Sequence, residues 1–316
     1  MRTAFIDQLV KEARINDKIF LLVGDLGYNV VEPFADEFPD RFRNVGIAEQ
    51  NMISTAAGMS TCGKIPYAST FAVFAAGLSM VGYNVYIYSI GNFPTLRCIE
   101  QIRNDIAYYK GNVKIVSVGA GYAYGSQGVS HHATEELGMM RSIPNIVVCS
   151  PCDPIEARCI TMISANYDGP MYLRLGKAGE VVIHEQFVQD LNIGDILPVL
   201  KTDGTEKVIL SSGSILGDAL KSAKEKGVDI YSIPFVKPLN KCQMVDIANR
   251  YSDITILEEN QKSCGVGSAV IEVISDLYCT GEIHRFPKIK RIAIEDQFYH
   301  LSGSQSYLRK QAGLVL

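Results

Sequence analysis

The sequence lacks the features that would place the protein in a membrane or on a nucleic acid. Its apolar runs are interrupted by Gly, Ser or Pro before they reach the ~18 residues that suggest a membrane-spanning helix. The net charge is −4, with both signs interspersed and no basic stripe, which disfavours nucleic acid as a partner. The first residues form an amphipathic helical pattern without the apolar core of a signal peptide. We therefore expect a cytoplasmic protein without a membrane partner.

Metal and redox signatures are also scarce, although the chain has eight cysteines. Only Cys149 and Cys152 have C-x-x-C spacing, and no second ligand pair accompanies them. A strand pattern leads into the motif and Pro151 lies between the two cysteines, unlike a thioredoxin motif that opens a helix. We interpret both as buried reduced thiols and predict no metal ligands in this chain.

The length and the alternation of patterns predict the fold class. A chain of 316 residues suggests two domains. Apolar strand patterns alternate with helical patterns, which predicts α/β architecture with two doubly wound parallel-sheet domains. We place the first domain at 1–183, a polar linker at 184–206 and the second domain at 207–316. No short-period repeat is expected.

One carboxylate stands out in "RFRNVGIAEQNMISTAAGMS", residues 41–60. Glu49 precedes a run of small residues, which indicates a helix that packs closely against its neighbours. A glutamate in the first turn of a helix interacts favourably with the helix dipole and can cap free amides. An apolar setting would also raise its pKa, which makes Glu49 a candidate general acid or base.

Two aromatic residues form a second candidate element. Phe71 and Phe74 in "YASTFAVFAAG" are three residues apart and would share one face of a helix. Such a pair is either core or a wall against which a flat heteroaromatic ring stacks.

A glycine-rich loop and an arginine complete the candidates. "GAGYAYGSQGVSHHATEE" (119–136) places glycines between a strand and a helix, where the backbone can approach a ligand. Its spacing is not G-x-G-x-x-G, so it does not predict a dinucleotide site. The adjacent His131 and His132 could transfer protons or bind hydroxyls, or could be a cap and a surface residue. Arg174 at a strand end could hold a phosphate or form an ordinary ion pair.

These motifs together resemble one family. "DRFRNVGIAEQNM", "STFAVF", "GSQGVSHHATEELGMMRSIPN" and "VKPL" occur in the order found in the C-terminal half of transketolase, and most closely resemble the small subunit of split transketolases. The resemblance runs from the first helix to the final "GSQSYLRKQAGL". It implies a pyrimidine-binding domain followed by the transketolase C-terminal domain.

The resemblance implies thiamine diphosphate as the cofactor and assigns residues to it. The glutamate that matches Glu49 protonates nitrogen 1′ of the aminopyrimidine ring. Phe71 and Phe74 match aromatics that stack on this ring, and Asp25 matches an aspartate near the cofactor. The Mg²⁺ motif, G-D-G with a later asparagine, is absent from the sequence. An N-terminal subunit with the diphosphate-binding domain would therefore supply the Mg²⁺ site, in a heterotetramer.

The resemblance also implies that the subunit helps to transfer a two-carbon ketol unit between sugars. The implied substrate-binding residues are Asn29, Gln127, His131, His132 and Arg174, with Arg174 holding a sugar phosphate. A family histidine falls at Gly119 and a family aspartate falls at Gln127. A histidine-to-glycine change would remove a hydrogen-bond partner and open space. We therefore predict a modified or nucleotide-linked sugar as the acceptor.

Other functions remain open from the sequence. The beta subunit of a 2-oxo acid dehydrogenase supplies an equivalent glutamate and aromatics, although "GIAEQNM" and "GVSHHATEE" fit transketolase better. Deoxyxylulose-phosphate synthase shares "VGIAEQ" but normally carries both halves of the site in one chain. A non-catalytic partner subunit is a further alternative, and the presence of Glu49, Phe71, Phe74 and His131 argues against it.

Overall fold

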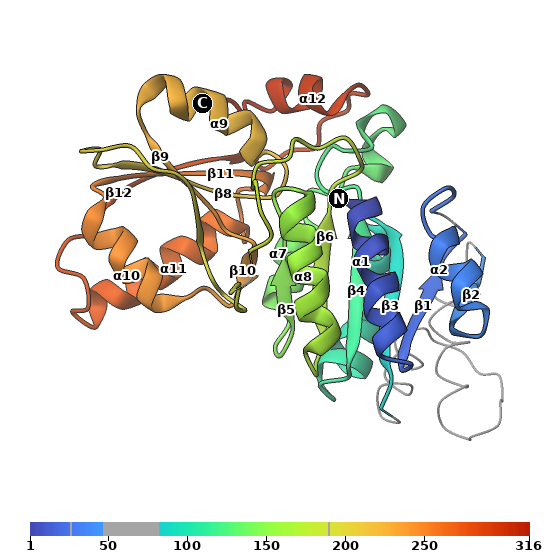
Figure 1. Ribbon diagram of the computed structural model, residues 1–316. Helices are drawn as coiled ribbons and strands as arrows, with labels where there is room; N and C mark the ends of the chain where they lie inside the picture. The colour runs from blue at the N-terminus through green and yellow to red at the C-terminus, as the bar shows by residue number, and fades with distance from the viewer. Residues whose placement is uncertain (26, 47–81, 189) are drawn as a thin grey trace.

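The computed structural model describes residues 1–25, 27–46, 82–188 and 190–316. Two sheets lie side by side, and each is flanked by helices (Figure 1). The first sheet contains β1 (Ile19–Val23), β2 (Phe42–Asn44), β3 (Asn84–Ile90), β4 (Val113–Val118), β5 (Val147–Cys149), β6 (Met171–Leu175) and β10 (Phe235–Lys237). The second contains β7 (Leu197–Leu200), β8 (Lys207–Ser212), β9 (Asp229–Ser232), β11 (Asp253–Gln261) and β12 (Lys288–Ile294). The predicted α/β class is confirmed.

The first sheet has the strand order β10-β5-β6-β4-β3-β1-β2. Side chains alternate between the two faces of a strand, and β3, β4 and β6 are buried on both faces. Tyr86 and Tyr88 of β3 pack with α1 (Arg2–Ile15), α2 (Glu32–Glu37) and α8 (Pro154–Asn166), whereas Val85 and Ile87 join the opposite core. That opposite core also contains side chains of α7 (Glu136–Ser142) and of the π-helix η2 (Ile102–Ala107). Ile99 of α6 (Ile99–Gln101) packs against this core, and α5 (Phe93–Leu96) contacts β3 and α7.

The second sheet has the order β12-β11-β8-β9-β7. On one side lie α9 (Leu216–Lys226) and α12 (Gln305–Gln311), and on the other lie α10 (Lys241–Arg250) and α11 (Val266–Cys279) (Figure 1). The core around α10 and α11 is continuous with the α7 side of the first sheet. The two units therefore share buried apolar side chains.

Both sheets are mixed at one edge rather than fully parallel. β10 pairs antiparallel with β5, although it lies in the chain beyond the first unit. β7 pairs antiparallel with β9 and lies within 184–206, so the segment that we predict as a linker contains an edge strand. Such strands of three or four residues carry too little periodicity to be detected from sequence.

Local signals define other elements sharply. α8 begins at Pro154 after Asp153, whose side-chain Oδ1 accepts a hydrogen bond from the Glu156 backbone N–H at 2.8 Å. A capping Asp followed by Pro at the first helical position is a strong helix start, and α8 follows this signal. β3 and α10 are absent from the sequence-based prediction. β3 contains Asn84 and Ser89 within an otherwise apolar and aromatic run, which obscures its pattern.

Candidate functional site

A cavity of about 620 Å³ opens beside the carboxyl end of β4. The loop after β3, the loop after β4 and the loop after β12 line it, so both units contribute. Ligands of open α/β sheets bind outside the carboxyl ends of the strands, next to the point where the strand order reverses. The strand order reverses at β1, which has β2 on one side and β3 on the other, and the loop after β3 lines this cavity. We take this cavity as the candidate site.

His131 lies on the wall of the cavity, as the last residue of the short helix η4 (Val129–His131). Its Nδ1 is 3.0 Å from the Ser130 hydroxyl, and its ring centroid is 5.3 Å from that of Phe93 at a steep angle. Burial lowers the pKa of His131, and the neighbouring Arg97 guanidinium lowers it further. Neutral imidazole can donate and accept hydrogen bonds, as recognition of sugar hydroxyls requires.

His132 also lines the cavity but is only 4% exposed. Its ring packs edge-on against Tyr122, with the centroids 5.0 Å apart. Burial lowers the pKa of His132, and a hydrogen bond to the Gly125 backbone opposes this effect. The Nε2 atom of His132 is buried and has no hydrogen-bond partner among the residues that the structure describes. A buried nitrogen without a partner at a cavity wall is a feature that a bound ligand would satisfy.

The loop that carries both histidines depends on glycine. Gly119 has φ +97° and Gly121 has φ +60°, in the region that favours glycine. A Cβ at Gly119 would lie 2.3 Å from the Tyr124 ring. The expectation that glycine at position 119 opens space is therefore wrong, because the Tyr124 ring already occupies that space.

Asp25 and Asn29 lie in the loop after β1, at the same edge of the sheet. Both have positive φ, +51° and +60°. Asp25 accepts hydrogen bonds at Oδ1 from the Tyr28 hydroxyl (2.9 Å) and from the Asn44 amide (3.2 Å). Neither Asp25 nor Asn29 lines the cavity beside His131. Their expected roles toward cofactor and substrate stay predictions.

Arg174 does not lie at an open site in this structure. It is 3% exposed, and its Nε donates to Glu136 Oε1 at 2.5 Å. Its Nη2 donates to the backbone oxygens of Ala133 (2.7 Å) and Glu259 (3.0 Å). The guanidinium thus joins β6, the histidine loop and β11. The sequence left two roles open for Arg174, binding a phosphate or forming an ordinary ion pair. The geometry is that of the ion pair, and it does not support phosphate binding.

The remaining predicted residues fall outside the cavity or outside the described chain. Gln127 is exposed in η3 (Gly125–Gln127) and does not line the cavity. Glu49, Phe71 and Phe74 lie outside the described residues. Their assigned roles stay predictions from the sequence.

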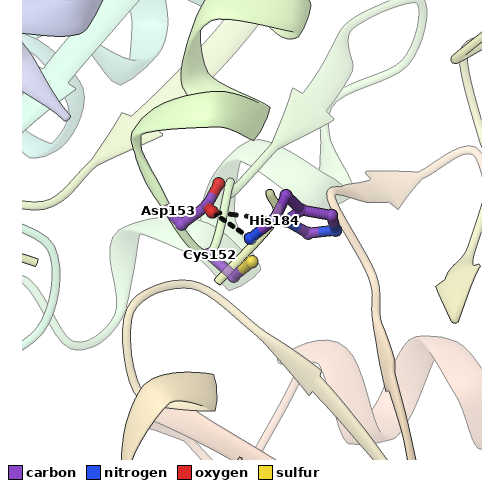
Figure 2. A group of neighbouring side chains, drawn as sticks. All are labelled: Cys152, Asp153 and His184. Atoms are coloured by element: carbon purple, nitrogen blue, oxygen red, sulfur yellow. Dashed lines mark hydrogen bonds and ion pairs between the residues drawn. The ribbon is translucent and has the colours of Figure 1, made fainter. Parts of the chain in front are cut away.

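A second polar cluster lies away from the cavity and contains Cys152, Asp153 and His184 (Figure 2). Potential ligand atoms of the three residues lie within 4.8 Å of one another. Asp153 Oδ2 accepts hydrogen bonds from the backbone N–H groups of Ile183 and His184, both at 2.8 Å, and lies 3.3 Å from His184 Nδ1. These bonds attach the strap after β6 to the start of α8. Hydrogen bonding explains the geometry without a metal ion.

The thiols have the properties of buried core cysteines. Cys149 and Cys152 are free and fully buried. Burial raises the pKa of both thiols well above the ordinary value. Redox-active and metal-binding cysteines need the opposite, a depressed pKa. The geometry agrees with buried reduced thiols.

Comparison with known proteins identifies the family. Residues 1–179 match the pyrimidine binding domain of transketolase, and residues 198–314 match the transketolase C-terminal domain. The chain belongs to the transketolase family. The resemblance read from the motifs is thereby confirmed.

Three relatives show which part of a transketolase this chain resembles. A protein of Methanocaldococcus jannaschii, described as a transketolase C-terminal section, is 34% identical over 99% of this chain and 92% of its own length. One of the subunits of an apulose-4-phosphate transketolase, from Actinobacillus succinogenes, is 29% identical over 90% of this chain and 84% of its own. A solved structure described as a split-gene transketolase, inactive beta4 tetramer, is 30% identical and superposes with a TM-score of 0.80, covering 99% of this chain and 93% of the other.

Several features of the cavity were not predicted from the sequence. Phe93, Tyr122 and the segment 297–299 line the cavity, and the last of these comes from the second unit. Their positions depend on strand order and on the packing of the two units. In the described chain, none of the helices is long and apolar enough to cross a membrane.

Proposed function

We propose that this chain is one subunit of a two-chain transketolase that moves a two-carbon ketol unit between sugars with thiamine diphosphate. The observation that carries the proposal is the cavity of His131 and His132 at the carboxyl edge of a pyrimidine-binding sheet. The relatives that match most of this chain are themselves described as a section or a subunit of a transketolase. Their similar lengths favour a partner chain that completes the enzyme.

The chain has histidines that could bind sugar hydroxyls and a glutamate that could protonate the pyrimidine ring of the cofactor. Thiamine diphosphate, when bound, supplies the electron sink for breaking the bond next to a ketose carbonyl. Glu49 would hold and deliver the proton at nitrogen 1′ of the cofactor pyrimidine. His131, with its pKa lowered, would accept and donate hydrogen bonds to donor-sugar hydroxyls as a neutral imidazole. His132 lies in the same wall and would help to hold His131 in place beside the substrate.

The metal belongs to the partner subunit in this proposal. Mg²⁺ bound to a diphosphate requires hard oxygen ligands, and the sequence lacks the G-D-G motif with its later asparagine. The N-terminal subunit would supply these ligands, and two copies of each chain would give a heterotetramer. The tetramer formed by the β chains of a relative supports self-association of this chain.

The acceptor is proposed to be a modified or nucleotide-linked sugar. Arg174 is buried in an ion pair with Glu136, and only 3% of its side chain is exposed. An arginine in this position is not free to hold the phosphate of an ordinary pentose phosphate. One relative is named for apulose 4-phosphate, a sugar other than the ribose and erythrose phosphates.

Reconstitution with the diphosphate-binding subunit tests the proposal. The mixed chains should transfer a ketol unit from xylulose phosphate in the presence of thiamine diphosphate and Mg²⁺, whereas this chain alone should not turn over. A panel of sugars should include ribose phosphate, apulose 4-phosphate and nucleotide-linked sugars as acceptors or products. Decarboxylation of a 2-oxo acid instead of ketol transfer would contradict the function, and full rates with ribose phosphate would contradict the proposed acceptor.

A further inference from the structure

The carboxyl end of β11 in the second unit attaches to the loop that carries the two cavity histidines. The Glu259 Oε1 atom accepts a hydrogen bond from the Tyr122 backbone N–H at 3.0 Å. Further along the strand, the Gln261 backbone N–H donates to the Thr134 backbone oxygen at 2.7 Å. The two histidines lie in the chain between these points, so β11 holds the loop on both sides of them.

Glu259 is buried and is itself held in place by α12. Its Oε2 atom accepts hydrogen bonds from Arg309 Nη2 at 2.5 Å and from the Gln305 amide at 3.0 Å. Arg309 also donates to Asp218 Oδ2 at 2.7 Å, which fixes the guanidinium. Charge-assisted hydrogen bonds of this kind are stronger than neutral ones. The carboxylate therefore has a defined position from which it binds the Tyr122 N–H.

Tyr122 links Glu259 to the histidines. Its side chain is buried, and its ring lies edge-on to His132 with the centroids 5.0 Å apart. Next to Tyr122, Gly121 exchanges backbone hydrogen bonds of 2.8 and 2.9 Å with Ala133. A Cβ at Gly121 would lie 2.4 Å from Glu259, so glycine at this position allows the carboxylate to approach. His132 is thus fixed by the tyrosine ring and by the backbone bridge at the next residue.

We propose that Glu259 is a positioning residue of the ketol transfer, although it belongs to the second unit and does not line the cavity. Through the Tyr122 N–H it sets the place of the His132 ring, and thereby of the neighbouring His131 imidazole. The inference rests on the proposed function, because it concerns the histidine that is proposed to bind donor-sugar hydroxyls. A group that binds substrate needs surrounding side chains that lock its geometry. One hydrogen-bond acceptor of the second unit therefore controls the efficiency of a site in the first.

The test compares two substitutions of similar size in the complex with the diphosphate-binding subunit. Glu259→Gln keeps an oxygen that can accept from the Tyr122 N–H, whereas Glu259→Met has only a weakly accepting sulfur. Both leave Arg309 without its charge partner, so a purely structural effect should be similar in the two. Glu259→Met should lower kcat/KM for ketol transfer about 3- to 10-fold, the effect of one lost hydrogen bond. Glu259→Gln should stay within about twofold of wild type.

A double variant determines whether Glu259 acts through His131. In a His131→Ala background, Glu259→Met should change kcat/KM by less than about twofold, because substitutions that act through one group are not additive. An undiminished loss in that background would overturn the proposal, and so would equal losses in Glu259→Gln and Glu259→Met. If thermal melting shows that Glu259→Met does not fold, both substitutions are combined with Arg309→Met, which removes the unpaired charge.

Proton–carbon NMR of the isolated full chain tests the positioning without turnover. Glu259→Met should shift the imidazole signals of His131 and His132, because the Tyr122 ring beside His132 moves, whereas Glu259→Gln should not. The signals of the exposed His284 should stay in place in both variants. Unmoved signals of His131 and His132 in Glu259→Met would overturn the proposal. A wild-type complex without ketol transfer would overturn the proposed function and with it the role in that reaction, whereas the imidazole signals would still decide whether Glu259 positions the histidines.

Discussion

Two regions of the molecule differ in how their buried polar side chains are paired. At the seam between the two units, buried charges meet protein partners: Arg174 pairs with Glu136, and Arg309 pairs with Glu259 at 2.5 Å. At the cavity, His131 is half-buried beside the Ser130 hydroxyl, and the Nε2 atom of His132 has no hydrogen-bond partner in the described part of the chain. Both regions contain residues that the sequence marked as functional.

At the seam, a buried carboxylate of the second unit holds a loop of the first unit. Glu259 of β11 accepts hydrogen bonds from the Tyr122 backbone N–H at 3.0 Å and from the Gln305 amide at 3.0 Å. A Cβ at Gly121 would lie 2.4 Å from Glu259, so this glycine permits the close approach. The second unit thereby holds the start of the histidine loop. Charges at the seam thus position the loop that carries His131 and His132, which line the cavity.

The largest expected effect concerns Glu49, the carboxylate that is proposed to protonate the cofactor. Glu49→Ala should lower turnover of the reconstituted enzyme about 10² to 10⁴-fold, as loss of general acid–base catalysis does. Unfolding midpoints should stay close to wild type, and Glu185→Ala, at an exposed glutamate, should leave turnover unchanged. Intact turnover with a loss of about 1 kcal/mol in stability would assign Glu49 to helix capping instead.

The next largest effect should come from the seam and should appear in stability. Arg174→Ala leaves Glu136 buried without its partner, and we expect the free energy of unfolding to fall by about 3–5 kcal/mol. Urea denaturation measures this. The double variant Arg174→Met/Glu136→Met should recover much of the loss, since it removes both charges. Unchanged stability with a raised KM for a phosphorylated sugar would restore the phosphate-binding role.

A smaller effect is expected from His131 on the cavity side. His131→Ala should lower kcat/KM about 5- to 10-fold, because one hydrogen bond contributes about 0.5–1.5 kcal/mol. The pKa of His131 is lowered, so the neutral form should prevail above the ordinary value of about 6.5. The wild-type profile of kcat/KM should therefore be flat above that pH and decline only at lower pH. His284→Ala, at an exposed histidine, is the matched control, and an equal loss there would contradict a role for the cavity.

The smallest expected effect concerns a third histidine, His184. Burial alone would lower the pKa of His184, but its hydrogen bond to Asp153 and the charges of Glu156 and Asp153 raise it above the ordinary value. A raised pKa adds stability that is complete below about 6.5 and is lost as the pH rises through the folded-state value. His184→Gln should therefore cost about 1 kcal/mol at acidic pH and less at alkaline pH. Denaturation at both pH values measures the difference, and a cost that grows with pH would contradict the ion pairing.

The sequence by itself determined most elements, the α/β class, the family and the histidine pair. These follow from local signals: Asp153 and Pro154 start a helix, glycines permit the turn at 119–121, and apolar runs between helices read as buried strands. Tertiary structure alone decided which residues the cavity contains. It placed Phe93 beside His131 on the cavity wall, and it buried Arg174 against Glu136. A sequence specifies residue types along a line, but the partners of a charge and the neighbours of a ring depend on which distant strands and units pack together.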